Sequence, residues 1–391
     1  MAKTMKNKDI LLAVCGSVSF YKAYEILSLL KKEGANVRVM LSDGALKFTN
    51  LISFEALCDK KVLSSVSENW QSGLDHISYS KNDLIIIAPA SANTINKISC
   101  GIADNVFLET ILASTCPKLL APAANHNMLE NFATKKSLEI LSQNGYEICE
   151  PISKTLACGD IGKGALADPK IIVEMAKRVL GKDEFYIGKK VIITSGPTTE
   201  KIDDVRGITN FSSGKMAKAL ADAFYYLGSE VIFISSKEFE TPYKFIKFEN
   251  SNELLAILNS QNTDKNDILI MCAAISDYIP KTKFNGKMKK NENGINLELI
   301  LNTDILKNTN LKCKKIGFKM EMDKNTAIQN AKNMLIDKNL DAVCLNILDE
   351  NIKFGSDETY IDFITKKSCK TTEFTDKLSA AKKIAEFIKT L

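Results

Sequence analysis

Hydroxyl and small residues follow several short apolar runs in this chain of 391 residues. The runs at residues 10–15 and 84–90 have the length of buried parallel strands. Just after these runs and the one at 37–41 stand Gly16, Ser17, Ser42, Ser91 and Asn93. Main-chain N–H groups and hydroxyls at such strand ends suit a phosphate. The same residues also suit helix capping, and spacing alone leaves both interpretations open.

Two further side chains could carry acid–base chemistry. His76 lies in a polar stretch before the run at 84–90, and a near-neutral imidazole suits a general base. Cys158 lies among three glycines in the segment 155–164, which is typical of a flap that can bring a thiol to a neighbouring site. A structural histidine and a bystander thiol are the competing interpretations.

A β–loop–α–Gly–β pattern occurs twice and predicts the elements that position these residues. The first copy comprises a strand near 9–14, a helix over 20–32 that ends at Gly34, and a strand at 37–41. The second comprises a strand at 190–194, a loop over 195–214, a helix over 215–227 and a strand at 231–234. We therefore predict an α/β protein with two doubly wound three-layer domains, residues 1–182 and 189–391.

Composition excludes several classes of protein. Lys and Arg number 52 against 47 Asp and Glu, so the net charge of +5 gives no case for nucleic-acid binding. No apolar run approaches the ~20 residues of a membrane span. Ten cysteines without a C-x-x-C pair indicate reduced thiols and a cytoplasmic protein, and two histidines exclude a poly-His metal site. No G-x-G-x-x-G follows either first strand, which weakens a nicotinamide-dependent reductase as an alternative.

Several segments together resemble a known family. The segments 88–94, 101–105 and 122–128, with His76 and the flap at 157–159, resemble the flavin-dependent phosphopantothenoylcysteine decarboxylases. The segments 194–198, 204–216, 273–278 and 287–290 resemble phosphopantothenate–cysteine ligase. Their order and spacing are similar to those of the bacterial bifunctional enzymes of coenzyme A biosynthesis over nearly the whole chain. The resemblance implies a flavodoxin/Rossmann-like flavoprotein domain followed by a Rossmann-like ligase domain.

For the first domain the resemblance implies FMN as cofactor and decarboxylation of phosphopantothenoylcysteine to 4'-phosphopantetheine. His76 would be the base, Cys158 the final proton donor, and Asn125 and Met128 substrate contacts. The strand-end residues would hold the flavin: Gly16, Ser17, Ser42, Ser91 and Asn93. Three residues depart from the family pattern, and we expect the contacts to the decarboxylase substrate to differ there: Ala124, Leu129 and Ala165.

For the second domain the resemblance implies ligation of 4'-phosphopantothenate with cysteine, driven by CTP with Mg²⁺ through an acyl-cytidylate. Asn210 and Lys289 would be catalytic, and Arg206 and Ala273 would bind substrate. Asp277 would contact the nucleotide or its Mg²⁺. The remaining nucleotide contacts would be Lys287, Phe318, Lys338 and Asn346.

The resemblance also implies an assembly of identical chains, with trimers of the flavin domain and dimers of the ligase domain, together a dodecamer. A flavin-binding regulatory or scaffold protein of the same fold remains an alternative, since relatives of that kind lack the histidine. The presence of both His76 and Cys158 favours the enzyme.

Overall fold

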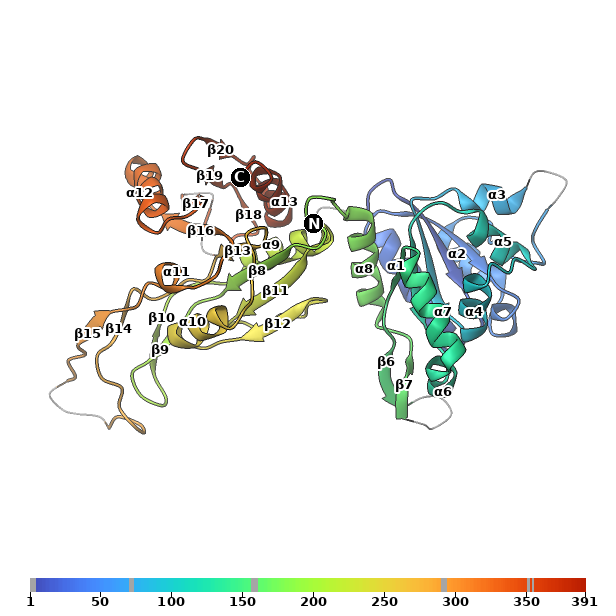
Figure 1. The fold of residues 1–391 in the computed structure, drawn as a ribbon, viewed down its shortest axis with the longest axis horizontal. Helices are drawn as coiled ribbons and strands as arrows, with labels where there is room; N and C mark the ends of the chain where they lie inside the picture. The colour runs from blue at the N-terminus through green and yellow to red at the C-terminus, as the bar shows by residue number, and fades with distance from the viewer. Residues whose placement is uncertain (1–4, 70–73, 156–160, 290–293, 350–351, 354) are drawn as a thin grey trace. The chain divides into compact units, whose positions relative to one another are not determined.

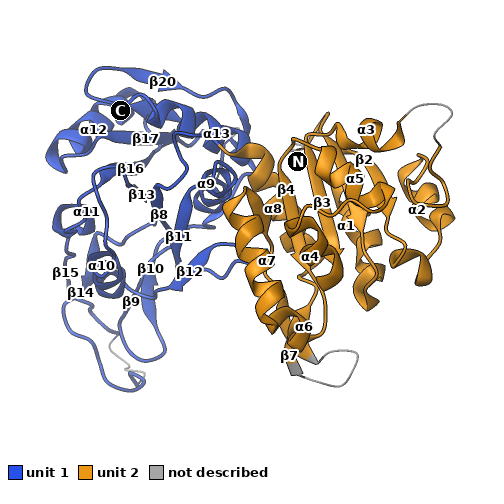
Figure 2. Ribbon diagram, turned by 45° about the vertical axis from the view of Figure 1, so that its right-hand side comes forward, with its two compact units in different colours: residues 1–2, 183–391 blue, residues 3–182 orange. Residues whose placement is uncertain are grey.

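The computed structural model describes residues 5–69, 74–155, 161–289, 294–349, 352–353 and 355–391. The chain divides into two compact units, residues 3–182 and residues 1–2 with 183–391 (Figure 2). We call them the N-terminal and C-terminal units and describe each by itself.

The N-terminal unit is built on a five-stranded sheet in the order β2-β1-β3-β4-β5, and every pair in it is parallel. Its strands are β1 (Asp9–Val14), β2 (Asn36–Leu41), β3 (Leu84–Ala90), β4 (Lys118–Pro122) and β5 (Tyr146–Ile148). Helices α1 (Lys22–Lys32), α2 (Leu51–Cys58) and α8 (Pro169–Gly181) share one apolar core with the sheet. Helices α4 (Ala92–Ser99), α5 (Val106–Ala113) and α7 (Phe132–Gln143) share the other (Figure 1).

The sequence of β3 explains these two layers. All seven of its residues are buried. Leu84 and Ile86 belong to the core beneath α1 and α8, whereas Ile85 and Ile87 belong to the core beneath α4 and α5. Alternate side chains of a strand point to opposite faces, so a continuous apolar run is what a sheet covered on both faces requires.

The C-terminal unit has an eight-stranded sheet in the order β12-β11-β8-β13-β16-β17-β19-β20. Its first six strands are parallel: β12 (Lys244–Lys247), β11 (Glu230–Ser235), β8 (Lys190–Ser195), β13 (Ile268–Met271), β16 (Lys314–Glu321) and β17 (Ala342–Ile347). The last two strands, β19 (Asp362–Ile364) and β20 (Cys369–Thr371), pair antiparallel. Helices α9 (Lys215–Tyr226) and α13 (Lys377–Ile388) cover one face. Helices α10 (Ser251–Asn259), α11 (Ile305–Asn308) and α12 (Lys324–Asp337) cover the other.

The predicted fold class, two doubly wound three-layer α/β domains, is confirmed. Element boundaries differ in detail. The helix predicted over 20–32 begins as a 3-10 turn, Val18–Tyr21, before α1. The stretch 195–214, predicted as loop, contains the hairpin of β9 (Thr199–Lys201) and β10 (Gly207–Thr209), where short strands escape a search for apolar runs.

Smaller antiparallel pairs stand apart from the two sheets. In the N-terminal unit β6 (Ile152–Thr155) pairs with β7 (Ile161–Ala165). In the C-terminal unit β14 (Tyr278–Pro280) pairs with β15 (Leu299–Leu301), and β18 (Glu358–Thr359) pairs with β21 (Thr375–Asp376). In the described part of the chain, no helix has both the length and the apolar character needed to cross a membrane.

Candidate functional sites

A cavity of about 930 Å³ lies where the turns after β1, β2 and β3 meet. The strand order of this sheet reverses between β1 and β3, and open α/β sheets bind ligands at such a switch point. All the predicted flavin contacts line the cavity: Gly16, Ser17, Ser42, Ser91 and Asn93. The sequence-based grouping of these residues therefore corresponds to one site in the structure.

The hydroxyls of this cavity also cap their own turns. Ser17 Oγ accepts a hydrogen bond from Ser19 N at 3.3 Å, and Ser42 Oγ accepts one from Ala45 N at 3.2 Å. Ser91 Oγ accepts from Thr94 N at 3.3 Å and lies 3.1 Å from Thr94 Oγ1. Capping and ligand binding are thus compatible here, because each cap holds a hydroxyl and nearby N–H groups at the cavity wall.

Two glycines bring the first two turns together. A Cβ atom on Gly16 would lie 2.6 Å from the main-chain carbon and oxygen of Gly44, closer than real Cβ contacts occur. Both glycines line the cavity. The close approach of the β1 and β2 turns therefore depends on the absence of a side chain at position 16.

The hairpin of β6 and β7 forms another part of the wall. Ala124 N donates to Gly164 O at 3.1 Å, and a Cβ on Gly162 would lie 2.7 Å from His126 Cβ, so the hairpin packs closely on the turn after β4. That turn carries Asn125, which caps α6 (His126–Glu130) through Asn127 N, and the exposed Met128. Asn125, Met128 and Ala165 line the cavity. Cys158 lies outside the described residues.

The cavity wall suits a flavin nucleotide. Hydroxyls and main-chain N–H groups lie at the strand ends, and Lys22, Lys97 and Lys154 supply positive charge. Apolar and aromatic side chains also line the wall and can pack against a ring system: Val18, Tyr21, Phe48, Phe107, Leu108 and Met128.

His76 is not among the residues that line this cavity. It lies on the short helix α3 (Asp75–Ser80), which packs against α5. Its Nδ1 lies 3.8 Å from Glu109 Oε2, and α5 carries Glu109 next to the lining residues Phe107 and Leu108. His76 is therefore linked to the cavity wall through α5.

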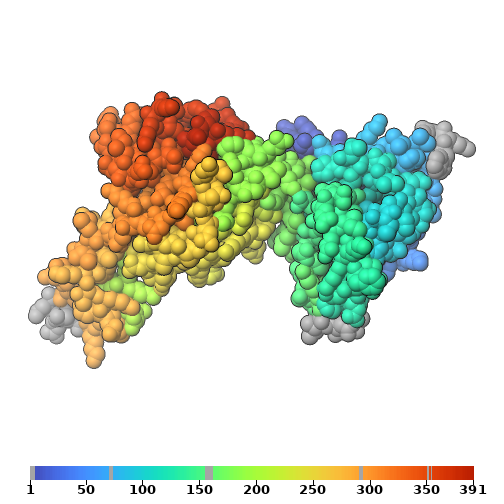
Figure 3. Space-filling model, viewed as in Figure 1, coloured from blue at the N-terminus to red at the C-terminus, as the bar shows by residue number. Residues whose placement is uncertain are grey.

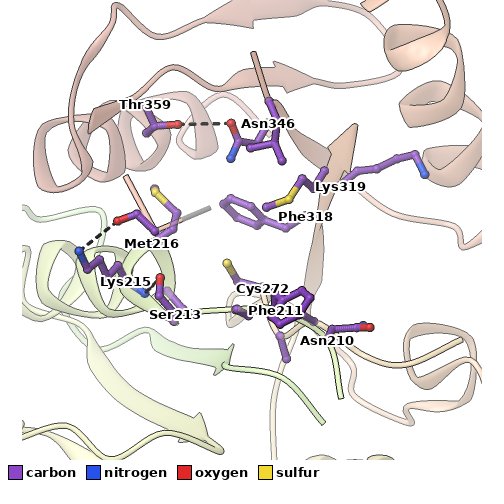
Figure 4. Close-up of a pocket in the computed structure, with 18 of the residues that line it drawn as sticks. Asn210, Phe211, Ser213, Lys215, Met216, Cys272, Phe318, Lys319, Asn346 and Thr359 are labelled. Atoms are coloured by element: carbon purple, nitrogen blue, oxygen red, sulfur yellow. Dashed lines mark hydrogen bonds between the residues drawn. The ribbon is translucent and has the colours of Figure 1, made fainter. Parts of the chain in front are cut away.

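A second cavity, of about 590 Å³, lies in the C-terminal unit at the carboxyl ends of β13, β16 and β17. The first turn of α9 and residues 352–353, 355–356 and 358–359 complete its described wall (Figure 4). The ring of Phe318 and the sulfur of Cys272 point toward its centre in Figure 4, whereas the amine of Lys319 points away. Asn346 receives a hydrogen bond from Thr359 Oγ1 at 3.4 Å.

Most of the predicted ligase residues line this second cavity. The structure brings together Asn210, Ala273, Asp277, Phe318, Lys338 and Asn346. Asn210 Nδ2 donates to Ile275 O at 3.0 Å, and Lys338 pairs with Asp304 at 3.0 Å. In the described part of the chain, no group of three or more His, Cys, Asp or Glu side chains forms a metal site. Asp277 and Glu358 are exposed carboxylates of the described wall, and Asp277 is the predicted one that could contact a metal ion carried by a substrate phosphate.

Arg206, Lys287 and Lys289 lie outside the described wall of this cavity. Arg206 Nη2 and Nε contact Asp203 Oδ2 at 2.5 and 3.0 Å, and Nη2 also donates to Met288 O at 2.8 Å. This hydrogen bonding lowers the pKa of Asp203, chiefly through Arg206. Arg206 therefore ties the turn at 203–206 to the segment that carries Lys287 and Lys289, both of which are exposed.

Sequence analysis missed four lysines of the second cavity, Lys215, Lys319, Lys353 and Lys377, and two of these begin helices. Lys215 begins α9 and bonds Asp357 at 2.7 Å and Gly355 O at 3.0 Å. Lys377 begins α13, and its Nζ donates to Ser356 O. Lys215 lies in the segment 204–216, which resembles the ligase family, but no role was predicted for it. Lys377 lies outside all segments that carry the resemblance, and only the fold brings it to the cavity.

The comparisons with known proteins agree with this geometry. Residues 1–181 match the family model "Flavoprotein", and residues 186–391 match "DNA/pantothenate metabolism flavoprotein C-terminal domain". The molecule is thus a two-unit α/β flavoprotein of pantothenate metabolism.

Curated relatives define the family more closely. The chain is 38% identical to the coenzyme A biosynthesis bifunctional protein CoaBC of Bacillus subtilis over 93% of its own length and 91% of that protein. It is 34% identical to the protein of that name from Borreliella burgdorferi, over 98% and 99%. The chain belongs to the family of coenzyme A biosynthesis bifunctional proteins. This confirms the resemblance drawn from the sequence and, with it, an enzyme with ligase and decarboxylase activities.

Two solved structures each cover part of the chain. A mutant PPC decarboxylase "complexed with pantothenoylaminoethenethiol" is 31% identical, with a TM-score of 0.40 over 44% of this chain and 97% of its own. The "C-terminal Domain of Coenzyme A biosynthesis bifunctional protein CoaBC" is 29% identical, with a TM-score of 0.43 over 53% of this chain and 97% of its own.

The contact between Gly16 and Gly44 gives a test of the first cavity. We expect Gly16→Ala to lower the melting temperature of the N-terminal unit by several degrees and to weaken flavin binding, because overpacking of this kind costs about 1–3 kcal/mol. Gly44→Ala should cost less, since its Cβ would lie 3.3 Å from Gly16 Cα. Calorimetry and flavin fluorescence measure both effects; equal behaviour of the two variants would contradict the packing argument.

Proposed function

We propose that the C-terminal unit joins 4'-phosphopantothenate to cysteine at the expense of CTP, and that the N-terminal unit decarboxylates the phosphopantothenoylcysteine so formed with FMN. The observation that carries the proposal is a cavity in each unit at the carboxyl ends of parallel strands. All five residues expected to hold the flavin line the first cavity, and six of the nine expected for the ligase line the second. The free thiol state of every described cysteine supports a cytoplasmic setting.

In the N-terminal unit, FMN would supply the redox chemistry when bound, and the chain would position and protonate the substrate. Ser17, Ser42 and Ser91 would hold the phosphate through their hydroxyls and the neighbouring N–H groups. Asn125 would orient the substrate carboxylate from the turn beneath the β6–β7 hairpin. The roles of His76 as base and of Cys158 as final proton donor rest on the resemblance.

In the C-terminal unit, the residues present suit a nucleoside triphosphate and an activated acyl group. The Phe318 ring can pack against a base, and Lys338 can reach anionic oxygens. Asp277 would hold Mg²⁺ together with the phosphates, since Mg²⁺ usually takes one or two carboxylates and completes its shell with substrate oxygens and water. Asn210 would bind the acyl-cytidylate. The hydrogen bond from Arg206 to Met288 O joins the turn at 203–206 to the segment of Lys287 and Lys289. All three cationic side chains would reach the substrates from there.

Lys377 would bind a phosphate in the same cavity. It is half-buried, and its amine is held by a main-chain carbonyl, because Asp357 pairs with Lys215 instead. Burial and, next, the positive charge of Lys215 lower the pKa of Lys377. A phosphate oxyanion would compensate the desolvated ammonium, so the two lysines at the starts of α9 and α13 would form a cationic corner for the triphosphate.

We therefore expect Lys377→Met to raise the KM for CTP by about tenfold to a hundredfold, as loss of a charge-assisted hydrogen bond of about 1.5–3 kcal/mol requires. The KM for cysteine should change little, because cysteine attacks the acyl group and not the phosphates. Steady-state kinetics with pyrophosphate detection measure both values. Lys383→Met, at an exposed lysine further along α13 and outside the cavity wall, is the control. A change confined to the cysteine KM would exclude the phosphate role.

The direct test of the proposed function is reconstitution from purified protein. Phosphopantothenate, cysteine, Mg²⁺ and CTP should yield CMP, pyrophosphate and phosphopantothenoylcysteine, and the protein loaded with FMN should then release CO₂ and form 4'-phosphopantetheine. Mass spectrometry follows each product. Ligation without CO₂ release would favour the alternative of a flavin-binding regulatory unit, and failure of both reactions would refute the proposal.

An assembly of identical chains would complete these sites. The β14–β15 arm, residues 278–280 and 299–301, exposes Tyr278, Leu299, Ile300 and Leu301. This arm reaches away from the sheet of its own unit (Figures 1 and 3). Exposed apolar residues on a short strand pair are typical of an interface. We place the dimer contact of the ligase unit on this arm and a trimer contact on the flavin unit, which together give a dodecamer.

Charge on the arm tests this assembly. Leu301 is 75% exposed, so Leu301→Asp should leave the fold intact and disrupt the dimer contact. Light scattering after size exclusion should give a mass of twelve chains for the wild type and of three chains for Leu301→Asp. Ile336→Asp, at a position 69% exposed on α12, is the matched control and should keep the wild-type mass. An unchanged mass for Leu301→Asp would remove the arm from the interface.

A further inference from the structure

Glu109 carries a buried oxygen that no other described group satisfies. Its Oε2 is inaccessible to solvent and has no hydrogen-bond partner, although the side chain as a whole is 33% exposed. His76 Nδ1 lies 3.8 Å from this oxygen. A buried carboxylate oxygen without a hydrogen bond destabilises the fold. Its presence here therefore suggests that Glu109 has a function besides stabilising the fold.

The packing of two helices fixes this pair. α3 carries His76, α5 carries Glu109, and the two helices lie side by side (Figure 1). Asn105 caps α5 through Leu108 N at 3.1 Å, and Thr110 Oγ1 bonds Val106 O at 2.7 Å, so the backbone around Glu109 is well held. The neighbouring Phe107 and Leu108 line the first cavity. One helix therefore presents apolar side chains to the cavity and a carboxylate to the imidazole.

We propose that Glu109 is a positioning residue for His76. A gap of 3.8 Å closes to a hydrogen bond with a small side-chain rotation, and such bonds are often long before substrate binds. The Glu109 carboxylate then accepts a hydrogen bond from Nδ1–H and fixes the neutral ring in the tautomer that carries no proton on Nε2. When Nε2 takes a proton from the substrate, the same carboxylate stabilises the imidazolium. This inference rests on the proposed function of His76 as the base.

The chain has only two histidines, which makes the tautomer measurable without substrate or flavin. Protein labelled with ¹⁵N-histidine gives two sets of ring signals in solid-state NMR, and His126→Gln assigns them. We expect the Nδ1–H tautomer to dominate at His76 of the wild type. In Glu109→Leu the Nδ1–H tautomer should lose this dominance, because the carboxylate that accepts the hydrogen bond from Nδ1–H is gone. The same tautomer in both proteins would overturn the proposal.

Kinetics of CO₂ release give the second readout. Glu109→Gln should lower kcat by about tenfold with KM unchanged, because a positioning group acts on the base and not on substrate binding. Glu109→Asp should restore part of kcat, and Glu139→Gln, an exposed carboxylate on α7, is the matched control. A purely structural role would lower the melting temperature of Glu109→Gln without the selective loss of kcat.

One further variant separates this inference from the proposed function. If His76→Gln keeps full decarboxylase activity, His76 is not the base and the proposed function loses that residue. If His76→Gln is inactive while Glu109→Gln and Glu109→Leu match the wild type in kcat and tautomer, the base stands and the positioning role is refuted. Should Glu109→Leu fail to fold, the tautomer measured in Glu109→Asp and Glu109→Gln decides the question.

Discussion

Parallel pairing of buried strands is the constraint on which both sites depend. Parallel strands need crossover connections, so helices cover both faces of each sheet and only the strand ends remain for ligands. In each unit the strand order reverses once, between β1 and β3 and between β8 and β13. The turns diverge at that point, and the first cavity lies there, whereas the second lies beside it at the ends of β13, β16 and β17. In both, polar residues after the strands gather around a cavity without disturbing the apolar cores.

The two units use this constraint with different chemistry. The first cavity has hydroxyls at three strand ends and two glycines that let adjacent turns touch, so its polar groups are mostly neutral and its wall partly aromatic. Among the described residues, five lysines line the second cavity, including those at the starts of α9 and α13, against three in the first. A flavin ring needs packing surface and one phosphate site, whereas a triphosphate needs several positive charges. The difference between the walls thus follows the difference between the proposed ligands.

The sequence predicted the parts of this structure that local pattern controls. Apolar runs and glycine stops located the strands and first helices, and hydroxyls after strands located the first cavity. Lys377 could not be found this way, because only the packing of α13 beside α9 brings it to the ligase cavity. Glu109 escaped for a similar reason: nothing in the spacing of residues 76 and 109 indicates that α3 and α5 pack together. Pairing between helices depends on tertiary contacts that periodicity does not encode.

Three residues predicted for the second site lie outside its cavity wall: Arg206, Lys287 and Lys289. Asp203 accepts hydrogen bonds from Val205 N, Arg206 N and Met288 N as well as from the Arg206 guanidinium. Since its folded-state pKa is lowered, this network stabilises the fold fully above the ordinary carboxyl pKa of about 4 and loses that contribution as the pH falls through the lowered value. At neutral pH this network therefore ties the turn at 203–206 to the main chain of Met288, while the side chains of Lys287 and Lys289 stay exposed.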